Sequence, residues 1–405
     1  MGFWDFLKDP IGFLTAWFNG LLLSWGLAPG VAQVIGFVLG AFVLATGAML
    51  FVTLLIWFER KVIGRIQDRL GPNRVGPWGI FQSIADMLKI FTKEYVTPLG
   101  VDWLPYNLAP ILSVASVLVV WAVLPFSITF YGADLNVGLL FVIAVGAMGE
   151  LAIVMAGWGS NNKYALLGAF RAVGQMISYA TPMVVALLVP VMMAGSLSLN
   201  EIVRQQEVWY VLISPAAALI FFIASIAEVG RSPFDLVEAE SELVSGFNIE
   251  YSGLKFGMFF VGEFLHAFTA ALLFATLFLG GWRGPGAEQF PILGFFYYFI
   301  KTGLVYFVTV LMRGSLPRFR MDQMMDLNWK VLTPLSLVVL LVTALANKLL
   351  VGLALGWRVA VLVLLNGVVL WVVNWLLLRY DRRRVRPEVT SVRRPVARPQ
   401  QGGLE

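Results

Sequence analysis

The segment EVGRSPFDLVEAESELVSGFNIEYSGLKFGMFFVGE, residues 228–263, places seven of the chain's 24 acidic residues within 36 positions, and long apolar runs flank it. Only Arg231 and Lys255 oppose these acids within the segment. A carboxylate inside or beside a bilayer is costly, so acids in such a place indicate function. Carboxylates that lie together also repel one another, so some keep their protons near neutral pH and titrate as a coupled group. An ordinary acidic cytoplasmic loop would explain one or two of these acids, but not Glu228 and Glu263, which lie at or inside apolar runs.

Composition places the chain among polytopic helical membrane proteins. Of its 405 residues, 59% are hydrophobic and 13% are charged, with a mean hydropathy of +0.81. The chain has no cysteine, which excludes iron–sulfur clusters, thiolate metal sites and disulfides that it would hold itself. His266 is the only histidine, which excludes a multi-histidine haem or metal site. Any redox centre, whether metal, FMN or iron–sulfur cluster, is therefore expected on a partner or as a diffusible ligand.

Nine apolar runs are each long enough to cross a hydrocarbon core of about 30 Å. They are residues 31–58, 108–130, 137–158, 174–194, 209–227, 256–279, 295–312, 331–351 and 359–377. Residues 1–30 are rich in aromatic side chains and interrupted by charges, which predicts an interfacial helix, with a transmembrane span as the alternative. The fold class is therefore all-α, a polytopic membrane protein with about nine transmembrane helices, an N-terminal interfacial helix and amphipathic cytoplasmic surface helices.

Loop charge predicts the orientation. If the segment after the first span is cytoplasmic, the cytoplasmic segments and the tail hold 23 of the 29 Lys and Arg, which is the bias expected for that side. This bias also explains the net charge of +5 without a nucleic-acid partner. The tail from residue 379 is rich in Arg and Pro and is expected to be disordered, or to fold on a partner or a phospholipid surface. We divide the chain into an N-terminal extension (1–30), a transmembrane domain (31–378) and a basic cytoplasmic tail (379–405), and we expect a bacterial inner membrane.

Residues 59–98 read ERKVIGRIQDRLGPNRVGPWGIFQSIADMLKIFTKEYVTP and predict two amphipathic helices on the membrane surface, separated by glycines and prolines. In the first, cations recur every four residues from Lys61 along one face. A pair of lipid-surface helices is one interpretation. A lid or cradle for an amphipathic ligand that enters from the lipid is another, with Arg60 and Asp86 as polar contacts in an apolar wall.

Residues 312–330 read MRGSLPRFRMDQMMDLNWK and carry closely spaced cations and acids. A positive-inside loop would explain them. Their spacing also favours fixed ion pairs that hold a docking surface.

Four motifs then occur in order: ERKVIGRIQDRLGPNRVGP, GWGSNNKYALLGAFRAVGQMISY, EVGRSPFDLVEAESELVSGFNIEY and LPRFRMDQMMDLNWK. Together they closely resemble the family of respiratory complex I membrane proteins that includes mitochondrial NADH dehydrogenase subunit 1. The resemblance covers roughly residues 31–350. It implies a membrane subunit that joins the hydrophilic redox arm to the proton-pumping arm and forms the lipid-facing entrance and much of the wall of a quinone chamber.

The resemblance also assigns roles to individual residues. Quinone, either ubiquinone or menaquinone, would be reduced near an iron–sulfur cluster that partner subunits hold. The residues implied at the quinone chamber are Arg60, Asp86, Arg231, Arg313 and Arg318, and Arg320 belongs to the same basic loop. The residues implied in an acidic funnel that couples quinone chemistry to the membrane arm are Glu228, Asp235, Glu238, Glu240, Glu242, Glu250 and Glu263.

One departure from the family pattern concerns the carboxylates inside the membrane. The family places a glutamate after the SY of QMISY, and this chain has Ala180 there. It has Glu150 instead in the middle of the preceding span, where a buried acid costs several kcal/mol unless it is protonated or partnered. We hypothesise that Glu150 replaces the missing carboxylate, while a protonated glutamate that only joins two helices is the alternative. His266, one turn beyond Glu263, could join a proton path, although a core histidine is the favoured interpretation.

These observations predict a subunit of a proton-translocating NADH:quinone oxidoreductase that couples quinone reduction to proton translocation and performs no complete reaction alone. The expected partners are the iron–sulfur and quinone-site subunits of the hydrophilic arm, the small and antiporter-like membrane subunits, and phospholipid. Two rival classes remain. One is the membrane anchor of a related hydrogenase or ferredoxin-linked complex, which the first cytoplasmic segment argues against. The other is a free-standing secondary transporter, for which the sequence offers no convincing inverted repeat.

Overall fold

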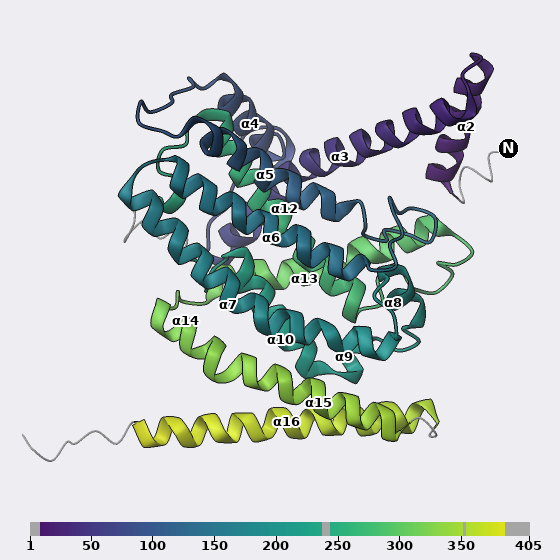
Figure 1. The fold of residues 1–405 in the computed structure, drawn as a ribbon, viewed down its shortest axis with the longest axis vertical. Coiled ribbons are helices and arrows are strands. Elements are labelled where there is room, and N and C mark those ends of the chain that lie inside the picture. The colour runs from purple at the N-terminus through teal and green to yellow at the C-terminus, as the bar shows by residue number, and fades with distance from the viewer. Residues whose placement is uncertain (1–8, 237–243, 351–353, 385–405) are drawn as a thin grey trace, which may run out of the picture.

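The computed structural model describes residues 9–236, 244–350 and 354–384, and every regular element within these ranges is a helix. Long helices form a bundle and shorter ones connect them (Figure 1). The long helices are α3 (Pro29–Ile66), α5 (Trp103–Trp121), α6 (Gly138–Gly159), α7 (Lys163–Ala194), α10 (Pro215–Val229), α12 (Gly253–Phe278), α13 (Pro291–Ser315), α15 (Thr333–Leu349) and α16 (Leu355–Arg384). The shorter elements are α2 (Pro10–Ser24), η1 (Pro77–Gly79), α4 (Gln82–Thr92), α8 (Leu199–Gln205), α9 (Tyr210–Ile213), η2 (Gly246–Asn248), α14 (Met321–Leu327) and η3 (Asn328–Leu332).

Within the described ranges, eight helices are long and apolar enough to cross a membrane. One of them is Met321–Leu349, in which α14, η3 and α15 follow one another without a break. The apolar helix α10 adds a shorter segment of 15 residues. Apolar runs fold this way in lipid because an α-helix satisfies its backbone hydrogen bonds internally. The predicted all-α, polytopic membrane fold is confirmed.

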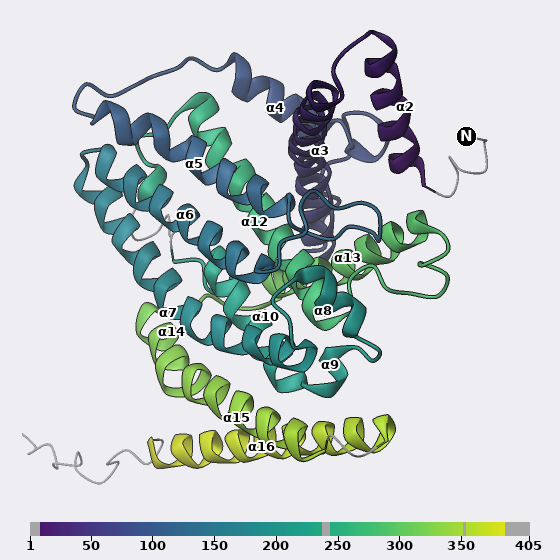
Figure 2. The same cartoon turned by 45° about the vertical axis from the view of Figure 1, so that its right-hand side comes forward.

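Helix α12 runs through the bundle and contacts α3, α5, α10 and α13 (Figure 2). Small residues permit the closest approaches between the helices. A Cβ on Gly262 of α12 would lie 2.9 Å from Ser113 Oγ of α5, and a Cβ on Gly157 of α6 would lie 2.3 Å from the Cβ of Ala169 in α7. Helices in membranes associate through such close packing because lipid is as apolar as their side chains.

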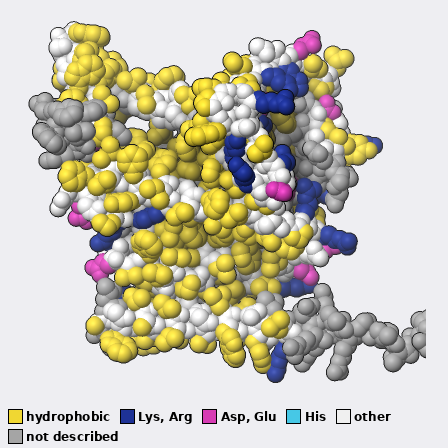
Figure 3. All heavy atoms as spheres, turned by 180° about the vertical axis from the view of Figure 1, so that it is seen from behind, with side chains coloured by type: hydrophobic (Ala, Val, Ile, Leu, Met, Phe, Trp, Pro, Cys, Tyr) yellow, Lys and Arg dark blue, Asp and Glu magenta, His cyan; other side chains and the backbone are white. Residues whose placement is uncertain are grey.

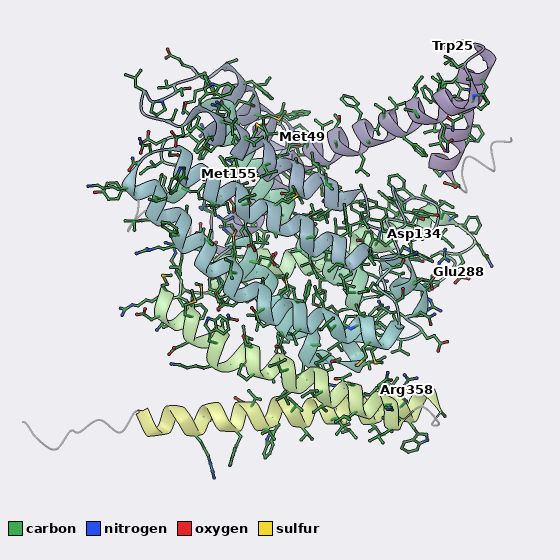
Figure 4. All side chains as sticks on the ribbon, viewed as in Figure 1. Trp25, Met49, Asp134, Met155, Glu288 and Arg358 are labelled. Atoms are coloured by element: carbon green, nitrogen blue, oxygen red, sulfur yellow. The ribbon has the colours of Figure 1, made fainter. Side chains whose placement is uncertain are left out.

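Helix α2 packs along the N-terminal half of α3, and together they project from the rest of the bundle (Figures 1 and 2). Trp17 and Trp25, which are 57% and 73% exposed, lie on this projection, and Trp25 marks its tip in Figure 4. Aromatic side chains of this kind settle at membrane interfaces. The predicted N-terminal helix exists from Pro10 onward, and residues 1–8 lie outside the described part of the chain.

Helix α4 is the amphipathic surface helix predicted for the second half of residues 59–98. Its apolar side chains Ile84, Leu88 and Phe91 recur at helical spacing and are exposed, as expected for a helix that lies on lipid or on a partner.

The first predicted surface helix is wrong as a separate element, because α3 continues without a break to Ile66. Within this continuous helix, the Glu59 side chain at the end of the apolar run is buried against Arg231 and Arg313 from other elements.

Two further boundaries differ from the sequence prediction. The fourth span begins at Lys163 as α7, earlier than residue 174, because residues 163–173, which are mostly apolar but include Lys163 and Arg171, form the first turns of the same helix. The last helix, α16, continues to Arg384 and so enters the segment expected to be a disordered tail. Residues 385–405 lie outside the described ranges.

Candidate functional site

A buried ion cluster surrounds Glu59, which is only 4% exposed and lies in the C-terminal part of α3. The Arg231 guanidinium donates from Nη1 to both Glu59 carboxylate oxygens, at 3.0 and 3.2 Å. From α13, Arg313 also donates to Glu59, and the Tyr306 hydroxyl lies 3.1 Å from Glu59 Oε2. A buried carboxylate needs such partners because its desolvation is otherwise uncompensated.

Arg231 extends this cluster to α12. Its Nε lies 3.1 Å from Glu263 Oε1, and its guanidinium lies 4.3 Å from the centre of the Phe264 ring. Gly230, at φ +72°, caps α10 in the left-handed region that favours glycine, and so turns the chain just before Arg231. The arginine therefore joins two carboxylates, one from α3 and one from α12.

A cavity of about 370 Å³ lies beside this cluster, between α5, α6, α7, α10 and α12. Its walls are mainly apolar, and three carboxylates reach it from three helices, namely Glu150, Glu228 and Glu263. Hydroxyl groups of α5, α10 and α12 also line it: Ser113, Ser116, Ser225 and Thr269. Glu263 thus belongs to the ion cluster and to the cavity at once.

Glu150 and Ala180 line this same cavity from the adjacent helices α6 and α7. Glu150 therefore lines the same cavity as Glu228. His266 also lines the cavity, one turn of α12 beyond Glu263, and its role stays a prediction.

The other predicted residues form separate contacts. Arg60 Nη1 lies 2.5 Å from Asp86 Oδ2, which ties the end of α3 to α4, and both side chains are more than a third exposed. Arg318 Nη2 lies 2.9 Å from Asp235 Oδ2. The basic loop that carries Arg318 and Arg320 also joins the acidic segment through its backbone, because Phe319 N donates to Pro233 O at 3.0 Å.

Glu250 lies apart from the cavity carboxylates. Its Oε1 accepts from Asn162 Nδ2 at 2.6 Å, and its backbone carbonyl accepts from the Tyr106 hydroxyl at 2.9 Å. Tyr106 stacks on Tyr251 with ring centroids 4.4 Å apart, and burial raises the pKa of Tyr251 above its usual range, which keeps that phenol neutral. Three more predicted acids, Glu238, Glu240 and Glu242, lie outside the described residues.

The sequence analysis missed two members of the ion cluster, Glu59 and Tyr306. Glu59 ends the apolar run of the first span, so the argument that selected Glu228 at the end of its own span applied to it equally. Tyr306 carries no such signal, because a tyrosine inside an apolar run is common in membrane helices.

The geometry suits the transfer of a change in charge. Arg231 contacts two carboxylates, so a proton or a new charge on one of them changes the electrostatic energy of the other in a poorly screened interior. Within the described residues, no group of three or more His, Asp or Glu side chains is arranged to hold a metal ion.

Comparisons with known proteins agree with the fold. The family described as NADH dehydrogenase matches residues 39–344. A Geobacillus protein, named as the H subunit of NADH-quinone oxidoreductase, is 48% identical over 301 residues, which are 74% of this chain and 90% of that protein. The Dehalococcoides mccartyi protein of the same name is 45% identical over 72% of this chain, which matches 82% of the length of that protein. The Anoxybacillus flavithermus protein of the same name is 45% identical over 74% of this chain and 90% of its own.

Proposed function

This chain belongs to the NADH dehydrogenase family, as a multi-pass membrane subunit of an NADH-quinone oxidoreductase, and on that premise we propose that it helps to form the quinone chamber and couples quinone reduction to proton translocation. The observation that carries the proposal is that Glu263 belongs both to the ion cluster and to the cavity. This carboxylate pairs with Arg231 of the buried cluster and lines the cavity that also holds Glu150 and Glu228.

The proposed sequence begins at the ion cluster. A quinone that is reduced nearby becomes negatively charged and takes up protons. This changes the electrostatic potential at Arg313 and Glu59. Arg231 then shifts its interaction between Glu59 and Glu263, since it contacts both. A change at Glu263 alters the protonation of the other cavity carboxylates, because carboxyl groups in one poorly hydrated space titrate together. The acidic segment after Arg231, with Asp235, Glu238, Glu240, Glu242 and Glu250, extends the coupling group in this proposal.

Glu150 takes the role of the carboxylate that the family places at the position of Ala180. Support comes from the cavity, which both residues line from neighbouring helices. In this proposal the carboxyl group lies on α6 instead of α7, and it lines the same cavity as Glu228.

The quinone entrance lies between α3 and α4 in this proposal. The Arg60–Asp86 pair fixes α4 to the end of α3, and the exposed apolar side chains of α4 offer a surface to a lipid-borne ligand. Both charged side chains are more than a third exposed, so water screens the pair and it adds little to stability. Arg313, in the last turn of α13, and Arg318, in the loop after it, would border the chamber. The remaining wall and the iron–sulfur cluster would belong to partner subunits.

Surface charge supports a cytoplasmic C-terminus in a bacterial inner membrane. Seen from behind, Lys and Arg gather mainly at one side of a broad apolar surface (Figure 3). The basic end of α16 and the start of α14 lie on that same side, which is the left in Figure 1. Asp134 and Glu288 lie at the opposite end of the bundle (Figure 4). We place the hydrophilic arm on the basic side, and the small and antiporter-like membrane subunits against the bundle.

The test is Glu263→Gln in the intact complex, because this change keeps the shape of the side chain but removes its charge. Quinone reduction and proton pumping should both fall about tenfold or more, equivalent to at least about 1.4 kcal/mol. NADH oxidation by an artificial acceptor that bypasses quinone should stay normal, and the amount of intact purified complex shows that the complex is assembled. A matched control is Glu201→Gln on α8, whose side chain is 46% exposed and pairs with Arg204. Normal quinone reduction and pumping in the Glu263→Gln complex would reject the proposal.

A further inference from the structure

Gln175 of α7 is fully buried, with 0% exposure, and lies behind the turn that carries Glu228 and Arg231. Its Nε2 donates to Ala227 O at 2.6 Å and to Phe234 O at 2.8 Å. Ala227 is in the last turn of α10, and Phe234 is in the segment that follows. A single amide group therefore joins both ends of the turn between residues 227 and 234.

The two charged residues of the proposed coupling path lie between these two hydrogen bonds. Glu228 points to the cavity, and Arg231 points to the ion cluster. Inside the turn, Gly230 N donates to Ala227 O and Phe234 N donates to Arg231 O. The separation of the two ends of the turn affects how the Glu228 and Arg231 side chains are directed, and the two hydrogen bonds from Gln175 link these ends.

The chemistry of the amide supports this role. Both of its N–H donors serve backbone carbonyls, which also fixes the orientation of the amide plane. Its Oε1 is buried and has no hydrogen-bond partner among the described residues. A buried acceptor without a partner costs about 1–3 kcal/mol, so the side chain is placed for its donors and not for its acceptor.

We propose that Gln175 is a positioning residue of the coupling path, which holds Glu228 and Arg231 in register by bridging Ala227 and Phe234 from a neighbouring helix. This inference rests on the proposed function and adds a residue that touches neither quinone nor the cavity. Gln175 acts only through the turn that it bridges.

Asn328 provides a matched control. It is also fully buried, at 0% exposure, and donates from Nδ2 to Ser178 O of α7 at 2.7 Å. Its Oδ1 likewise lacks a hydrogen-bond partner within the described part of the chain. Asn328 therefore matches Gln175 in burial and in hydrogen-bond chemistry, and it contacts the helix that carries Gln175, but its hydrogen bond does not reach the turn.

The experiment compares Gln175→Met with Asn328→Met, and Gln175→Glu with Asn328→Asp, in the assembled complex. We expect Gln175→Met to lower the rate of quinone reduction about tenfold at a normal level of assembly, while Asn328→Met stays within about twofold. A glutamate at position 175 donates one hydrogen bond while protonated and none once ionised. The rate of Gln175→Glu, relative to the unsubstituted complex, should therefore fall as pH rises from about 6 to about 8, whereas that of Asn328→Asp should not.

Three results would overturn the inference. They are normal activity in Gln175→Met, an equal loss in the two methionine variants, or a Gln175→Glu complex whose relative rate is independent of pH. Failure of Gln175→Glu to assemble would also count against it, because a positioning contact is not required to build the subunit. Glu263→Gln, measured in parallel, separates this inference from its premise: if that variant is inactive while Gln175→Met is normal, only the role of Gln175 fails.

Discussion

Individual side chains decide where charge can lie inside this membrane protein. Glu59, Arg231 and Glu263 form a continuous ion cluster, and Glu263 brings it to the cavity that Glu150 and Glu228 also line. Each carboxylate lies at or inside an apolar run, where it is costly unless it is paired, protonated or hydrated. The pairing of Glu59 with two arginines and a tyrosine meets that requirement at one end of the cluster.

The proposal that Glu150 replaces a carboxylate at position 180 can be tested directly with substitutions at these two positions. Glu150→Gln should lower quinone reduction and proton pumping together, about tenfold, because it removes a titratable group from the cavity. Adding Ala180→Glu to that variant should restore much of both activities, since position 180 lines the same cavity. Both activities would be measured on purified complex in proteoliposomes.

The exposed Glu201→Gln on α8 serves as the control for carboxylate loss. If Glu150→Gln is fully active, Glu150 is structural, and the path must cross the gap at Ala180 through water or another acid. If the double variant stays inactive, position 180 does not substitute for position 150.

At the scale of elements, helix α16 supplies hydrogen-bond partners to the backbone and side chain at the break between α9 and α10. Helices α9 and α10 are separated at Ser214, which leaves the Ile213 carbonyl free of its usual helical partner. Asn366 of α16, 1% exposed, donates to Ile213 O at 3.4 Å, and its Oδ1 lies 3.1 Å from Ser214 Oγ. Backbone polar groups at membrane depth must find partners in protein. The family match ends at residue 344, so this contact comes from a helix beyond it.

Asn366→Leu should destabilise the packing of α16 on α9 and α10 by about 0.6–2 kcal/mol, the range for polar contacts between membrane helices. The measurement is the thermal unfolding midpoint of the purified complex, which should fall. Leu364→Ala is the control, because Leu364 is 68% exposed on the same helix. Equal midpoints for the two variants would show that the Asn366 contacts contribute nothing measurable.

At the scale of the whole molecule, the distribution of cations separates the two ends of the bundle (Figure 3). The chain has no cysteine of its own, so one introduced cysteine reports its side of the membrane in this chain alone. We expect a membrane-impermeant thiol reagent to label Glu288→Cys in intact cells and Arg379→Cys only in inside-out vesicles. Both positions are exposed. The reverse pattern would invert the proposed orientation and place the acidic segment outside the cell.

Sequence alone was sufficient for the fold class, for most of the spans and for selecting the three acids that line the cavity, but it missed Glu59. Spanning depends on about 20 consecutive apolar residues, which is a local property. Acids inside such runs are conspicuous for the same reason, and Glu150, Glu228 and Glu263 were found that way. Boundaries were less certain: α3 runs on past its apolar run to Ile66, and Glu59 makes a buried contact at the end of that run.

Only the tertiary structure decided which of these acids meet. Glu150, Glu228 and Glu263 reach one cavity, whereas Asp235 pairs with Arg318 and Glu250 with Asn162. The partners of Glu59 come from positions 172 and 254 residues away in the chain. Such meetings depend on how each helix is rotated about its own axis and against its neighbours, which no local pattern of residues specifies.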